Sequence, residues 1–131
     1  MQAEQIEHFR KTQKYVMQMR PVFKPNALFS DETQNYVTPM EPEPGDTVKI
    51  RFRAGKNNID CVYLISGSLR LMMKYEKTVG EFDFYVIEIP MNEDPLSYCF
   101  EIHAGKIRCF YNKRGISKNL QEYYSFSIVP G

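Results

Sequence analysis

The sequence has almost no net charge and no long apolar run. Its 17 basic residues are balanced by 16 acidic ones, and both kinds are spread along the chain. Nucleic-acid-binding domains gather basic side chains on one face, so this balance speaks against a nucleic-acid partner. No apolar stretch approaches the roughly 20 residues of a membrane-spanning helix, and the polar N-terminus lacks the hydrophobic core of a secretion signal. We therefore expect a cytoplasmic protein that binds neither a membrane nor a nucleic acid.

Cysteine is scarce, which limits metal and disulfide chemistry. The three cysteines, Cys61, Cys99 and Cys109, are odd in number, and their spacing fits no zinc-binding pattern. Cysteine without a disulfide is among the most often buried residue types, so we expect half-buried thiols in strands. This usage favours a reducing compartment. We predict no metal site and no cofactor.

Histidine is scarcer still, with only His8 and His103 in the chain. Neither belongs to a Ser–His–Asp arrangement that the sequence would support. A partnership of Cys99 with His103 is conceivable, because Cys99 and Cys109 fall on strands that should pair. The alternative is a structural histidine with its hydrogen bonds satisfied, and we favour it.

Acidic pairs occur twice, as Glu41 with Glu43 and as Glu93 with Asp94, each beside prolines in a predicted loop. Glycoside hydrolysis needs two carboxyl groups held by a rigid scaffold on opposite sides of a sugar ring. We therefore interpret these residues as solvated turn acids. Neither pair has calcium-loop spacing, and no glycine-rich phosphate loop is present. No catalytic residue is predicted.

What the sequence does contain is a helix pattern followed by a series of short strand patterns. Residues 3–19 are predicted to form a helix that Pro21 ends, which gives an N-terminal helical extension over residues 1–22. From Phe23 onward, β-rich segments alternate with turn residues. The predicted strands are Ala27–Ser30, Thr47–Arg53, Ile59–Ser66, Leu69–Tyr75, Phe82–Ile89, Ser97–Ala104, Lys106–Tyr111 and Tyr123–Val129.

Short strands with a turn every ten or so residues predict an all-β sandwich over residues 23–131. Alternation along each strand predicts which side chains point inward. These inward sets are Val48/Ile50/Phe52, Val62/Leu64, Tyr85/Ile87/Ile89, Tyr98/Phe100/Ile102 and Phe126/Ile128. The last strand runs directly into Pro130 and Gly131, which we interpret as a domain boundary within a longer protein.

Aromatic residues are plentiful: nine phenylalanines and nine tyrosines, although there is no tryptophan. Several are neighbours, as in FDFY at 82–85, CFY at 109–111 and YY at 123–124. Consecutive strand residues point to opposite faces, so some of these rings should be exposed or lie against a partner. An exposed aromatic face suits a sugar ring or another protein surface. Cross-strand pairs that stabilise the sheet are the alternative.

The order of several segments resembles a known family. They are PNALFSDETQNYVTP, GDTVKIRFRAGKNNIDCVYLI, EFDFYVIEIP, YCFEIHAGKIRCFYNKRG and YYSFSIVPG. In this order they resemble the N-terminal immunoglobulin-like, starch-binding-type domain of the α-amylase superfamily, as in cyclomaltodextrinases, neopullulanases and maltogenic amylases. The resemblance covers about residues 23–131. It implies an immunoglobulin-like antiparallel β-sandwich, here with a short N-terminal helix that the basic domain lacks.

The resemblance also implies a function. The module would be non-catalytic and would precede a catalytic barrel that hydrolyses α-glucosidic bonds. It would shape the substrate cleft, contact the barrel or a second subunit of a homodimer, and bind an α-glucan or maltooligosaccharide weakly. The stacking candidates are Tyr63, Tyr75, Phe84, Tyr111 and Tyr123. Possible hydrogen-bond donors to sugar hydroxyls are Arg51, Arg53 and Lys74, for which solvated strand faces are the alternative.

Two other functions remain open. The first is a pure protein–protein interaction module without sugar affinity, which a contiguous apolar patch would favour over a concave aromatic groove with a polar rim. The second is a stand-alone enzyme. The missing nucleophile and acid–base pair speak against it, and a cluster of His103 with a carboxylate in a pocket would favour it.

Overall fold

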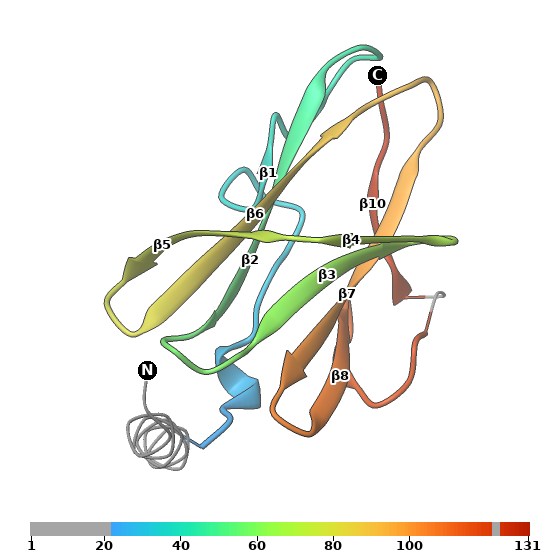
Figure 1. Cartoon of the computed structure of the whole chain (residues 1–131). Coiled ribbons are helices and arrows are strands. Elements are labelled where there is room, and N and C mark those ends of the chain that lie inside the picture. The colour runs from blue at the N-terminus through green and yellow to red at the C-terminus, as the bar shows by residue number, and fades with distance from the viewer. Residues whose placement is uncertain (1–21, 122–123) are drawn as a thin grey trace, which may run out of the picture.

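The structure, a computed structural model, describes residues 22–121 and 124–131, so the helix predicted over residues 3–19 lies outside the described part. The described residues form two antiparallel sheets that pack around one apolar core (Figure 1). The all-β sandwich predicted from the strand pattern is therefore confirmed.

The first sheet has the strand order β1-β2-β6-β5 and the second the order β4-β3-β7-β8-β9, with β10 beside β7. The strands of the first sheet are β1 (Val37–Thr38), β2 (Thr47–Gly55), β6 (Phe82–Pro90) and β5 (Lys74–Val79). The strands of the second are β4 (Leu69–Met72), β3 (Cys61–Ser66), β7 (Leu96–Ala104), β8 (Ile107–Asn112), β9 (Gly115–Ser117) and β10 (Phe126–Ile128).

The core lies where the alternation of apolar residues predicts it. Val48, Ile50 and Phe52 on β2 are fully buried, because every second residue of this strand faces the other sheet. Across the sandwich, the ring of Phe52 lies 4.7 Å from that of Phe100 on β7. All the predicted inward sets are buried or packed against this core, so that prediction is confirmed.

The segment after β3 differs from its prediction as a single strand over Leu69–Tyr75. It forms β4, which pairs with β3, and then β5, which pairs with β6 in the other sheet. Figure 1 shows β4 and β5 as one long ribbon across the front of the molecule. Met73, buried between them, marks the change of sheet. We call Leu69–Val79 the shared edge segment, because it borders both sheets.

Other predicted boundaries also need correction. The strand expected over Ala27–Ser30 is a 3-10 turn, η1 (Pro25–Ala27), followed by a single bridge from Phe29 to Arg53. Proline at the first turn position fixes the backbone for a helical turn and removes a ladder donor, which explains the difference. The predicted strands on either side of Gly105 form the antiparallel pair of β7 with β8.

Candidate functional site

The five aromatic residues predicted to stack on sugar do not share one face. Tyr63 and Tyr111 belong to the second sheet, whereas Tyr75 and Phe84 belong to the first. Tyr123 lies outside the described residues. The structure therefore presents the four described rings as separate surfaces rather than as one platform.

Tyr63 is half-buried under a cluster of charged groups on the outer face of the second sheet. The Arg70 guanidinium of β4 lies 3.7 Å from the centre of the Tyr63 ring. Arg70 also donates two hydrogen bonds to Glu101 Oε2 of β7, at 3.1 Å from Nε and 2.6 Å from Nη2. His103 Nε2 lies 2.6 Å from the same oxygen, and its ring meets Tyr63 edge-on. One face of Tyr63 is thus already covered.

The carboxylate at the centre of this cluster is buried, with 9% of its side chain exposed. Burial alone would raise the pKa of Glu101, but the hydrogen bonds from Arg70 and His103 outweigh it and hold that pKa below its ordinary value. Glu101 therefore stays charged and ties β4 to β7 across β3. This is a structural role, and it makes His103 a histidine with a satisfied partner, as the sequence favours.

Tyr75 and Phe84 lie on the paired strands β5 and β6, but the register sets Tyr75 opposite Tyr85, so the Phe84 side chain points to the other face of the sheet. Tyr75 is 57% exposed, its ring stands edge-on to Tyr85, and its hydroxyl lies 2.6 Å from Thr78 Oγ1. Phe84 is half-buried and lines a hollow of about 330 Å³ with Lys77. Of the four described candidates, Tyr75 offers the most accessible ring.

Tyr111 instead faces the interior. Its ring stands edge-on to Phe52 and lies nearly parallel to Phe126, with centroids 5.7 and 6.2 Å away. Burial raises the pKa of its hydroxyl. A ring held in this way contributes to the core.

The basic residues considered as sugar donors differ in how far they are engaged. Arg51 forms a bidentate pair with Glu76 of β5, at 2.8 and 3.0 Å. Arg53 donates to the Ala27 carbonyl at 3.0 Å and lies 4.3 Å over the Phe82 ring. Lys74 is exposed. The two arginines thus have partners within the sandwich.

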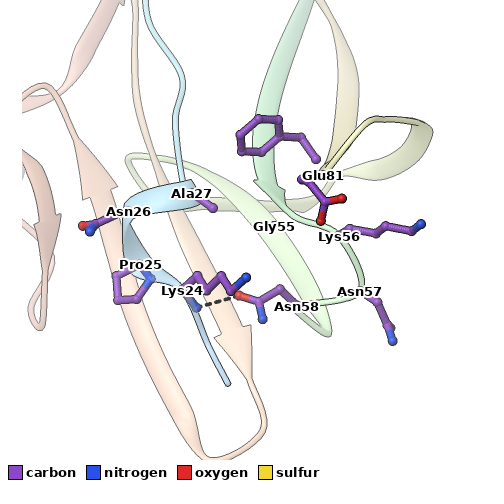
Figure 2. A pocket seen from close by; sticks show the side chains of 10 residues that line it. Lys24, Pro25, Asn26, Ala27, Gly55, Lys56, Asn57, Asn58 and Glu81 are labelled. Atoms are coloured by element: carbon purple, nitrogen blue, oxygen red, sulfur yellow. Dashed lines mark hydrogen bonds between the residues drawn. The ribbon is translucent and has the colours of Figure 1, made fainter. Parts of the chain in front are cut away.

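A hollow of about 710 Å³ lies at one end of the sandwich. The sequence predicts the segments around it only as turns or as the start of a strand. Its walls are the η1 turn, the turn after β2 and the start of β6 (Figure 2). The Asn58 side chain joins two of these walls: it accepts from Lys24 N–H at 2.7 Å and donates to the Val22 carbonyl at 3.0 Å. Only the packing of the sandwich brings these segments together, so the sequence carried no direct signal for the hollow.

A second surface feature is the apolar character of the shared edge segment. Leu69, Met72, Tyr75 and Val79 are each more than half exposed. Large exposed apolar patches on soluble domains are typical of sites that contact another protein. The segment is thus a candidate contact surface.

Among the described residues, no group of three or more histidine, cysteine or acidic side chains could hold a metal ion. Glu41, Glu43, Glu93 and Asp94 are all exposed, which confirms the interpretation as solvated turn acids. Within residues 22–121 and 124–131, no helix is long and apolar enough to cross a membrane.

Solved structures with a similar fold come from glycan-degrading enzymes. A cyclomaltodextrinase matches with a TM-score of 0.69 and 18% identity over 79% of this chain. A maltogenic amylase from S. marinus matches with a TM-score of 0.66 and 20% identity over 82% of the chain. A type III pullulan hydrolase from Thermococcus kodakarensis matches with a TM-score of 0.55 and 16% identity over 79% of the chain.

The chain corresponds to only a small part of each of these proteins: 19% of the cyclomaltodextrinase, 15% of the maltogenic amylase and 17% of the pullulan hydrolase. No curated protein matches the chain. The family model described as "Alpha amylase, N-terminal ig-like domain" matches residues 25–129, and the chain belongs to this family.

Proposed function

We propose that this chain is the non-catalytic N-terminal module of an α-glucan-hydrolysing enzyme. In this proposal it contacts the catalytic barrel or a second subunit, contributes to the shape of the substrate cleft, and binds maltooligosaccharides weakly. Family membership supports the module role, and the names of the similar structures support the α-glucan context.

The proposed contact with another domain or subunit is supported mainly by the exposed apolar side chains of the shared edge segment. Leu69 and Tyr75 are each 57% exposed on a segment that two charge-assisted pairs fix to the sandwich. Apolar side chains on a rigid strand bury surface at little conformational cost, which suits a contact with another domain. Weak glucan binding is supported separately by the accessible Tyr75 ring and by the hollow at the end of the sandwich, whose largely apolar lining includes polar side chains.

The second candidate function is a pure interaction module with no sugar affinity. The apolar edge favours it, because an exposed apolar patch needs no groove to bind protein. The cytoplasmic setting is also a proposal. It is supported by the three cysteines, which form no disulfide with one another.

The contact role is tested in the full-length parent enzyme with the double variant Leu69→Ser/Tyr75→Ser. The matched control is Ile107→Ser, which changes a side chain that is 47% exposed on β8. We expect the double variant to lower the rate of α-glucan hydrolysis and to weaken domain or subunit association in sedimentation, and the control to leave both unchanged. Equal behaviour of the two variants would contradict the contact role. Their unfolding midpoints as 131-residue chains show whether folding is preserved.

A further inference from the structure

We propose that the hollow between η1, the turn after β2 and the start of β6 is the saccharide-binding site of this module, and that it takes a short neutral α-glucan. This inference rests on the proposed function and assigns the weak glucan binding to residues outside the predicted aromatic set. We call this hollow the end hollow. Its recognition side chains are Lys24, Glu81 and Phe82.

The walls of the end hollow are fixed before any ligand binds. Lys56 N–H donates to the Glu81 carbonyl at 2.9 Å, which joins the turn after β2 to the turn before β6. The next amide, Asn57 N–H, donates to the Asp83 carboxylate at 2.8 Å, and Asp83 is itself buried. Together with the buried Asn58 side chain that holds η1, these bonds set the spacing of all three walls. A preorganised site loses less conformational entropy on binding.

The aromatic member of the site is also held in place. The Arg53 guanidinium lies 4.3 Å from the centre of the Phe82 ring and 5.1 Å from that of Phe29. Arg53 donates at the same time to the Ala27 carbonyl of η1. Phe82 is half-buried, so part of its ring is left for a ligand. It provides the apolar surface that the C–H face of a pyranose ring requires.

The polar members are available to a ligand. The side chains of Lys24, Asn26, Lys56 and Glu81 have no hydrogen-bond or ion-pair partner among the described residues. Figure 2 shows the Lys24 and Glu81 side chains on facing sides of the hollow, whereas Asn26 points away from it on the outer side of η1 and the Lys56 ammonium points outward on the opposite side. The Lys24 ammonium donates and the Glu81 carboxylate accepts.

This mixture of groups points to a neutral polyhydroxylated ligand. Sugar hydroxyls both donate and accept hydrogen bonds, so they can satisfy the Lys24 ammonium and the Glu81 carboxylate at once. A phosphate would use the lysine but would place its charge near Glu81, and a purely apolar ligand would leave both polar groups unsatisfied. A volume of about 710 Å³ also lies within the usual range of small-molecule sites, roughly 300–1,000 Å³, and accommodates more than one sugar ring.

The test is a titration of the ¹⁵N-labelled 131-residue chain with maltotriose up to millimolar concentrations, followed by amide and side-chain shifts. We expect saturable shifts at Asn26, Lys56, Asn57 and Glu81, and none with inorganic phosphate at the same concentration. The variant Lys24→Met/Glu81→Gln should weaken binding about five- to tenfold, because it removes one charged donor and one charged acceptor. The matched control, Lys118→Met/Glu93→Gln, changes the same residue types at exposed positions and should bind as the original chain does.

The other outcomes distinguish an error in the proposed site from an error in the proposed function of the module. Shifts confined to Tyr75 and Phe84 would overturn the end hollow as the site while leaving weak glucan binding intact. Shifts with phosphate but not maltotriose would replace the saccharide by an anion. The absence of any shift would overturn saccharide binding by this chain. None of these results tests whether the shared edge segment contacts another domain or subunit. The Leu69→Ser/Tyr75→Ser variant tests that role separately.

Discussion

The charge of Glu101 should stabilise the sandwich at neutral pH and cease to do so in acid. The test is Glu101→Gln, which keeps the shape of the side chain and removes its charge. In the original chain this carboxylate accepts two hydrogen bonds from Arg70 and contacts His103, and its side chain is 9% exposed. Hydrogen bonds to a charged partner contribute about 1.5–3 kcal/mol. The Arg70 side chain is 48% exposed and therefore screened, so we expect a loss of only about 1–2 kcal/mol at pH 7.

The direction of the pH dependence follows from the lowered pKa of Glu101. A carboxyl group whose pKa is lower in the folded than in the unfolded chain contributes its full stability above the unfolded value, about 4.3 for glutamate. That contribution is lost as the pH falls through the lower folded value. The stability difference between the original chain and Glu101→Gln should therefore shrink toward zero by about pH 3.

The assay is urea unfolding followed by tyrosine fluorescence at pH 7 and at about pH 3, with the slope of the transition checked for constancy. All carboxylates titrate in this range, so the measured quantity is the difference between variant and original chain at each pH. Glu93→Gln, in an exposed loop, is the control and should show no difference at either pH. An equal loss for Glu101→Gln at both pH values would refute the reasoning, because packing and not charge would then carry the effect.

Three further changes test other parts of the sandwich by unfolding in urea. Tyr98→Phe should be neutral or stabilising by up to about 1 kcal/mol, because the buried Tyr98 hydroxyl has no hydrogen-bond partner among the described residues; a loss of stability would reveal one. Gly105→Ala should cost about 1 kcal/mol, since the β7–β8 turn holds this residue at φ +61° with open space around it; an unchanged midpoint would contradict this strain. Phe52→Ala should cost about 3–5 kcal/mol at the centre of the core, and a loss below about 1 kcal/mol would contradict its place there.

The fold could be predicted from the sequence wherever one face of a strand is buried, because apolar residues then occur at every second position. The alternation of Val48, Ile50 and Phe52 has only one consistent inward face, so strand and core position follow together. Leu69–Tyr75 has the same local character, yet it divides between two sheets. The change at Met73 depends on which neighbours, β3 or β6, are available in space, and no local pattern records that choice.

The candidate site was less accessible to prediction for a related reason. The exposure of an aromatic ring depends on residues distant in sequence: Arg70 covers Tyr63, and Phe126 lies against Tyr111. Alternation indicated that some rings must face away from the core, but it did not identify the groups that cover them. The end hollow likewise requires η1, the turn after β2 and the start of β6 to meet. Each is an ordinary short segment when considered alone.

The construction of the shared edge segment favours a side-chain contact over extension of either sheet. A long flat edge strand invites pairing with another chain through its backbone. Here the segment passes from one sheet to the other at Met73, and the irregularity between Tyr75 and Lys77 interrupts the ladder. Lysines at 74 and 77 add exposed charge to the edge. Because these features oppose backbone pairing but leave Leu69 and Tyr75 exposed, a partner should recognise the apolar side chains of a fixed surface, which is the geometry of one domain docking on another.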